Sequence, residues 1–196
     1  MGDIKKTNRV QLLSYLVIFL LTTEVVLLIF QNRELKAILA SLSAVGQMEP
    51  LKPGERVEAF KLQSVGGNIN EFTYTDPAKK HLLFIFSTTC LHCEKTLPLW
   101  NEIVAKNTND NCNIIGVSPD PIEETVKFAS EKNLTFYIGS ATKDTSFSRK
   151  YKIPGVPETI LLSSNGTVEK TWAGELTPEQ AIEIQSLMNA QKGLTN

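Results

Sequence analysis

The segment Phe86-Ser87-Thr88-Thr89-Cys90-Leu91-His92-Cys93 decides the fold of this chain, because it joins an expected strand to an expected helix. Residues 81–86, just before the cysteines, form a short apolar run with the length of a buried strand. Apolar side chains after it recur at the spacing of one helical face: Leu97, Trp100, Ile103 and Val104. We therefore predict that a strand delivers two cysteines to the first turn of a helix.

That placement favours thiol chemistry. Unpaired amides and the positive end of the helix dipole stabilise an anion at a helix start, so we expect Cys90 to be a reactive thiolate. Two intervening residues let both sulfurs meet within one turn, so Cys93 can attack a mixed disulfide made by Cys90 and release the partner. Strand and helix context makes the Cys-x-x-Cys spacing a much stronger signal than it is alone. We assign both cysteines as catalytic.

Composition bounds the rest of the chain. Its 196 residues and 42% hydrophobic content suit one core plus accessory segments, and the net charge of −1 gives no reason to expect nucleic acid as a partner. The 3 cysteines are too few for a scaffold held by disulfides. We expect no cofactor and no bound metal.

The amino-terminal region indicates a single membrane anchor. Residues 1–9 carry Lys5, Lys6 and Arg9, and residues 10–30 are almost entirely apolar. About 20 such residues span a bilayer, whereas a cleavable signal has an apolar region of about 7–15 residues. We predict an uncleaved anchor over 10–30 with a cytoplasmic tail over 1–9, so the following domain lies outside the cytoplasm, on the periplasmic or cell-surface side. A cleaved signal is the alternative, because small residues follow the apolar run, namely Ala40, Ser41, Ser43 and Ala44.

Residues 31–50 are expected to be a juxtamembrane helix or linker, and 51–196 a mixed α/β domain. Strands are predicted at 59–62, 81–86, 113–117, 135–138, 159–163 and 168–172, with the last two joined by the hairpin signal Asn165-Gly166. Asp120 and Pro121 should cap and open one helix, and Thr177 to Gln180 form a capping box for the last one. A short helix is expected at 146–151. This order predicts a mixed sheet covered on both faces.

Three separated motifs resemble the thioredoxin fold, and in particular the membrane-anchored TlpA/ResA-type thiol–disulfide oxidoreductases, over about residues 51–191. Gly54, Phe60 and Leu62 match the leading segment of that family, although Ala59 stands where proline is usual. The redox helix is matched by Phe86, Cys90, Cys93 and Pro98. The run from Tyr151 to Pro157, followed by the hairpin, matches the segment that ends in a cis-proline.

The resemblance implies a substrate-binding role for Val156 and Pro157, because this loop lies against the cysteines and the residue before the proline pairs with an extended substrate segment. It also implies cysteine-containing protein clients and a redox partner that donates or accepts electrons. Phe84 stands where thioredoxin has a buried aspartate that helps deprotonate the second cysteine. The proton acceptor for Cys93 is therefore unassigned; Glu94 and Glu158 are candidates, but we expect both to be ordinary exposed charges.

Two further residues bear on the redox pair. His92 lies between the cysteines, where a protonated imidazole would stabilise the Cys90 thiolate, so we assign it a redox-tuning role. Cys112 precedes an apolar strand, and a free cysteine there is expected to be a small buried hydrophobe and not a resolving thiol. Thr89 and Thr96 replace the tryptophan and the glutamate that the resembling family carries beside its cysteines.

The expected function is that of a membrane-tethered enzyme, a thiol–disulfide oxidoreductase acting on protein clients. One alternative is an extracytoplasmic carrier of copper or another metal, with the same cysteines and His92 as ligands. The other is a peroxiredoxin-like peroxidase, which shares the fold. Its motif has proline and threonine ahead of the reactive cysteine, where this chain has Leu83 and Ser87.

Overall fold

The computed structural model describes residues 15–30, 32–33, 36, 49–108, 111–144 and 146–190. The chain divides into two compact units, Met1–Gly46 and Gln47–Asn196. In the first unit residues 15–30 are helical, and their large apolar side chains are exposed. None of the described helices combines the length and the apolar character needed to cross a membrane. Residues 10–14 of the expected anchor, and most of the expected helix over 31–45, lie outside the described residues.

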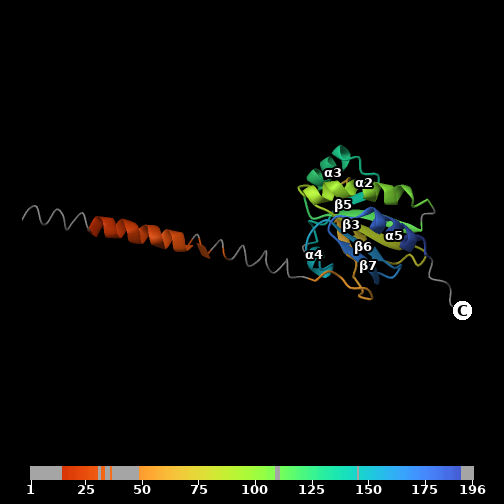
Figure 1. Cartoon of the computed structure of the whole chain (residues 1–196), viewed down its shortest axis with the longest axis horizontal. Helices are drawn as coiled ribbons and strands as arrows, with labels where there is room; N and C mark the ends of the chain where they lie inside the picture. The colour runs from red at the N-terminus through yellow and green to blue at the C-terminus, as the bar shows by residue number, and fades with distance from the viewer. Residues whose placement is uncertain are drawn as a thin grey trace, which may run out of the picture. The chain divides into compact units, whose positions relative to one another are not determined.

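The second unit is built on one mixed sheet (Figure 1). Its strands are β1 (Phe60–Gln63), β2 (Ile69–Phe72), β3 (Lys80–Ile85), β4 (Cys112–Ser118), β5 (Tyr137–Ser140), β6 (Glu158–Leu162) and β7 (Val168–Ala173). Its helices are α2 (Leu91–Ala105), α3 (Ile122–Glu131), α4 (Phe147–Lys150) and α5 (Pro178–Asn189). The strand order across the sheet is β2-β1-β5-β4-β3-β6-β7.

The centre of the sheet is parallel and its flanks are antiparallel. β3 pairs in parallel with β4, and β4 with β5, whereas β6 runs antiparallel to β3 and β7 antiparallel to β6. β3 lies between two strands and is buried along nearly its whole length, which explains its unbroken apolar sequence. The predicted mixed sheet is confirmed. Strand β2 was not predicted, because three of its four residues are exposed and it carries no apolar periodicity.

Each face of the sheet has its own core. On one face, side chains of α2, α3 and α5 pack with those of the sheet, as the contacts of Trp100, Phe128 and Ile184 show. The other face is covered by α4 and by the segment before β1, through Phe147 and Val57. Successive residues of β3 alternate between the two cores. Residues that pair directly across neighbouring strands point to the same face of the sheet, so the partner of each β3 residue faces the same core.

Helix ends agree with the sequence in one case and differ in another. Thr177 and Gln180 form the predicted capping box at the start of α5. The predicted cap of α3 is wrong, because Pro121 is its N-cap residue and no side chain in the described part of the chain caps this helix. The Asp120 carboxylate instead accepts hydrogen bonds from Ser87 and Thr88, in the loop that carries the cysteines.

Candidate active site

The topology gathers four loops at one edge of the sheet. β3 and β4 are parallel, so the loops at their carboxyl ends, before α2 and α3, leave the same edge. β6 is antiparallel to β3, and Ile85 at the end of β3 pairs with Glu158 at the start of β6. Glu158 also pairs with Ala173 at the end of β7. The cysteine loop, the segment before β6 and the connection from β7 to α5 therefore meet.

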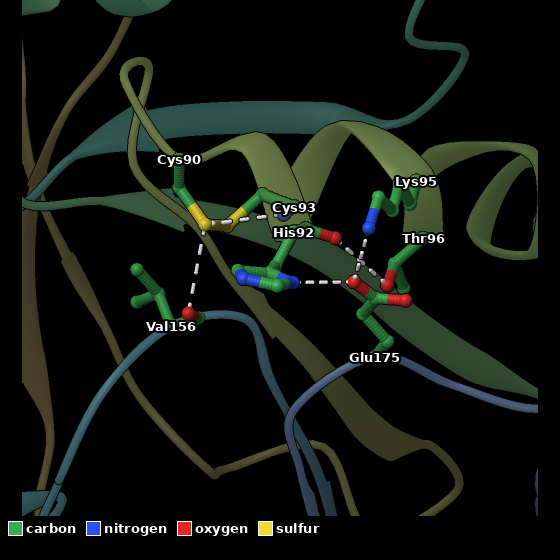
Figure 2. A network of polar contacts seen from close by, with 7 residues as sticks. All are labelled: Cys90, His92, Cys93, Lys95, Thr96, Val156 and Glu175. Atoms are coloured by element: carbon green, nitrogen blue, oxygen red, sulfur yellow. Dashed lines mark hydrogen bonds and ion pairs between the residues drawn. A yellow bond between two sulfur atoms is a disulfide. The ribbon is translucent and has the colours of Figure 1, made fainter.

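Cys90 and Cys93 form a disulfide with Cα atoms 5.2 Å apart (Figure 2). Cys90 is the N-cap residue of α2, and its Sγ accepts a hydrogen bond from the backbone N–H of Cys93 at 3.1 Å. The predicted placement of the pair at the helix start is confirmed. Cys90 is half-buried and Cys93 is fully buried, so an incoming sulfur reaches Cys90 first.

The segment before β6 lies directly against the redox pair. The Val156–Pro157 peptide bond is cis, as the resemblance implied. The carbonyl oxygen of Val156 is 3.5 Å from Cys90 Sγ, close enough to accept a hydrogen bond from the thiol of the reduced form. Val156 is half-buried and Gly155 beside it is exposed, so this backbone borders both the sulfur and solvent.

His92 is joined to a residue from a distant part of the chain. Its Nδ1 contacts Oε1 of Glu175, which lies in the connection between β7 and α5. Lys95 Nζ donates to the same oxygen at 3.2 Å. The hydrogen bonds from His92 and then Lys95 hold the pKa of Glu175 below its usual range. Figure 2 shows the imidazole between the disulfide and Glu175 in this view.

Asp120 ties the end of β4 to the cysteine loop. Its carboxylate accepts hydrogen bonds from Thr88 N at 2.6 Å and from Ser87 Oγ at 2.9 Å. Burial by itself raises the pKa of Asp120, but the hydrogen bonds from Thr88 and Ser87 outweigh it, so the pKa lies below its ordinary value. The carboxylate is therefore charged at neutral pH and anchors the loop.

The two carboxylates considered as proton acceptors have different environments. Glu94 is ion-paired with Lys132 at 2.7 Å. Glu158 is fully buried, so the prediction of an exposed charge is wrong. Neither carboxylate oxygen of Glu158 has a hydrogen-bond partner among the described residues, and burial raises the pKa of this carboxyl to about 8. The sequence shows only a charged residue after a proline. Its burial results from the pairing of β6 with β3 on one side and with β7 on the other.

Glu158 does not face the redox helix. It pairs with Ile85, whose side chain belongs to the core on the α4 face. Cys93 lies in the core on the opposite face, together with Phe84, whose ring stacks on Trp100 with centroids 4.7 Å apart. The strand position that holds an aspartate in thioredoxin is thus filled here by an aromatic stack.

Cys112, the remaining cysteine, is buried and has no disulfide partner. Burial raises the pKa of its thiol to about 12. The residue starts β4, at the strand end opposite the redox loop, because β4 runs parallel to β3. The prediction that it is a buried hydrophobe is confirmed.

Sequence reasoning missed two residues of this edge. Asp120 was interpreted as a helix cap, and no signal in its own neighbourhood indicated contact with residues 87–88, about 30 positions earlier. Glu175 lies in a short polar connection with no motif of its own, and only the tertiary structure brings it to His92.

Comparisons with known proteins agree with this geometry. A model of the AhpC/TSA family matches residues 53–171. Thiol-disulfide oxidoreductase ResA of Bacillus cereus is 31% identical over 99 residues, which cover 50% of this chain and 57% of that protein. Sporulation thiol-disulfide oxidoreductase A of Bacillus subtilis is 24% identical over 153 residues, covering 76% and 90%.

Among solved structures, the thioredoxin domain of a thiol-disulfide oxidoreductase from Bacteroides vulgatus aligns with a TM-score of 0.61 at 22% identity, over 71% of this chain and 99% of that domain. This likeness supports the thioredoxin-like fold, and the sequence relatives are named as oxidoreductases of the kind that the resemblance implied. The two sequence relatives are named thiol–disulfide oxidoreductases, and this chain has Cys90 and Cys93 at the spacing of a redox pair, within the match to the family model, so the chain belongs to the AhpC/TSA family.

Proposed function

We propose that this protein is a membrane-tethered thiol–disulfide oxidoreductase that exchanges disulfides with cysteine-containing protein clients. The observation that carries the proposal is the disulfide between a half-buried Cys90 at a helix start and a fully buried Cys93 behind it. A sulfur that a client can reach, backed by one that it cannot, is the arrangement that two-step exchange requires.

In the reducing direction, the Cys90 thiolate attacks one sulfur of a client disulfide. The attacked sulfur becomes part of a mixed disulfide with Cys90, and the other client sulfur leaves as a thiolate. Cys93, after losing its proton, attacks Cys90 Sγ. The client sulfur that was bonded to Cys90 then leaves as a thiolate, and the Cys90–Cys93 disulfide forms. Two electrons pass to the client, and the two protons lost by the cysteine pair equal the two that the client thiolates take up. The oxidising direction is the reverse.

Val156 and Pro157 are proposed as the substrate-contact residues. The 3.5 Å distance between Val156 O and Cys90 Sγ supports this role, because an extended client segment beside this backbone would have its own sulfur next to Cys90. His92 is proposed to tune the redox pair, as it lies between the cysteines and carries an exposed ring. A redox partner would then restore the starting state of the pair.

The membrane anchor is proposed over residues 10–30, with 1–9 in the cytoplasm and the domain from 51 onward outside it. Support comes from the apolar run itself, from the basic residues that precede it, and from the exposed apolar side chains along helical residues 15–30.

An insulin-reduction assay on the full chain, with dithiothreitol as electron source, tests the activity. We expect the wild type to accelerate reduction and Cys90→Ser to abolish the acceleration, while Cys112→Ala, the matched control for loss of a cysteine, retains it. If the wild type does not accelerate reduction but consumes hydrogen peroxide in a parallel assay, the peroxidase alternative replaces this proposal. Failure to exchange, combined with tight Cu(I) binding by reduced protein, would support the carrier instead.

A further inference from the structure

We propose that Glu175 is a positioning residue of the redox site, which acts through His92 to make the Cys90–Cys93 disulfide easier to reduce. This inference rests on the proposed function. It assigns a role to the connection between β7 and α5, a segment outside the cysteine helix and outside the loop of Val156 and Pro157.

The contact itself is the first support. One carboxylate oxygen of Glu175 forms hydrogen bonds with both Nδ1 of His92 and Nζ of Lys95. These two residues lie in the first turns of α2. Thr96 Oγ1 also donates to the backbone oxygen of His92 at 3.3 Å. Backbone and ring of His92 are thus each held by a defined partner, although the residue is exposed.

Glu175 is presented from a fixed backbone. Gly174 N donates to the carbonyl oxygen of Pro157 at 2.8 Å, which joins this connection to the proline loop. Leu176 is buried in the same core as Cys93, and Thr177 caps α5. With anchored residues on both sides, the carboxylate stays at the mouth of the redox site before any client arrives, so little ordering is needed to hold the imidazole.

The chemistry follows from the ring orientation. A carboxylate on Nδ1 keeps the proton on that nitrogen and orients the imidazole. In Figure 2 the other ring nitrogen points away from Glu175, toward the side of Val156. When that second nitrogen also carries a proton, the imidazolium held there can stabilise the thiolate that Cys90 carries in the reduced form. Whatever stabilises the thiolate favours the reduced form of the pair.

The sign of the effect separates two roles that Glu175 could have. A carboxylate acting directly on the thiolate would repel it, so its removal would make the disulfide easier to reduce. A carboxylate acting through His92 has the opposite sign, and its removal would make the disulfide harder to reduce. Lys95 shares the same oxygen and offsets the direct charge, which favours the second role.

The test is the equilibrium of the Cys90–Cys93 pair with glutathione, measured for the wild type, Glu175→Ala, His92→Ala and the double variant. We expect each single variant to shift the equilibrium constant about two- to fivefold toward the disulfide, in the range of an exposed ion pair. In the His92→Ala background, Glu175→Ala should have no further effect, because residues that act through one another are not additive.

Glu102→Ala is the matched control, because Glu102 is an exposed carboxylate paired with Lys106 at 2.7 Å near the far end of α2. It should not move the equilibrium. A shift toward the dithiol in Glu175→Ala, no shift, or an equal shift in both backgrounds would overturn the inference. These results leave the proposed function intact, since that fails only if the wild type does not exchange disulfides.

Discussion

The Asp120 carboxylate accepts a hydrogen bond of 2.6 Å from the backbone N–H of Thr88, two residues before the reactive cysteine. Ser140 Oγ donates to the carbonyl oxygen of Asp120 at 2.5 Å, so β5, β4 and the cysteine loop form one hydrogen-bonded chain. The position of Cys90 at the helix start therefore depends on strands far from it in sequence.

Asp120→Ala should lower both stability and exchange rate. Loss of the acceptor leaves the Thr88 N–H and the Ser87 hydroxyl without their partner, which costs about 1–3 kcal/mol. Chemical denaturation and an insulin-reduction assay measure the two effects. Asp144→Ala is the control, since Asp144 also accepts hydrogen bonds from a backbone N–H and a serine but lies beside α4. It should lower stability and leave the exchange rate unchanged. If Asp120→Ala exchanged as fast as the wild type, the loop would not need this anchor.

The two cysteines should behave asymmetrically. Cys93→Ser should accumulate a mixed disulfide with a client, because Cys90 still attacks and nothing resolves the intermediate. Cys90→Ser should trap none, since Cys93 is fully buried. Mass spectrometry of non-reduced adducts measures this difference. Equal trapping by both variants would mean that the roles are assigned wrongly.

Glu158 should make stability fall as pH rises. Burial raises its pKa to about 8, so the folded state holds a proton that the unfolded state releases near its ordinary value. Its contribution is fully present below the unfolded pKa and is lost as pH rises through about 8. Denaturation midpoints of the wild type and Glu158→Gln should therefore diverge between these limits, with the variant gaining relative stability at higher pH. If the midpoints of the two proteins followed parallel curves against pH, Glu158 would not be a buried, protonated carboxyl in the folded state.

The Cys112→Ala variant should exchange disulfides at the wild-type rate and lose only the stability that its buried side chain contributes by packing. The buried thiol has its pKa raised to about 12, so it supplies no thiolate at neutral pH. Removing one buried sulfur costs about 1 kcal/mol in unfolding free energy. In reduced native protein, iodoacetamide should modify Cys90 and spare Cys112, as peptide mapping would show. Lost turnover in a stably folded variant would indicate a resolving role.

Membrane topology can be tested with the same thiol. If the domain lies outside the cytoplasm, a membrane-impermeant maleimide should label reduced Cys90 in intact cells or protoplasts. Cys90→Ser is the control for specific labelling, because Cys112 is buried. Labelling that appears only after lysis would place the domain on the cytoplasmic side.

Local patterns in the sequence predicted most elements of the fold. The apolar run before Cys90, the hairpin at Asn165-Gly166 and the capping box at Thr177 each involve interactions within a few residues, so spacing alone reveals them. The redox pair was predictable for the same reason, because a strand, two cysteines and a helix follow one another directly. Strand β2 was missed since its side chains are mostly exposed and no apolar alternation marks it.

Contacts between distant segments were decided only by the tertiary structure. Asp120 satisfies the rule for a helix cap locally, yet the parallel pairing of β3 and β4 brings it to Thr88, where it binds the cysteine loop. Glu158 is charged and follows a proline, which favours exposure, but it starts a strand that pairs on both sides and is buried. Glu175 meets His92 only because β7 ends at the same edge of the sheet as β3. A sequence pattern reports a side chain's own neighbours along the chain, whereas charge, burial and partners at this site come from strands that meet in space.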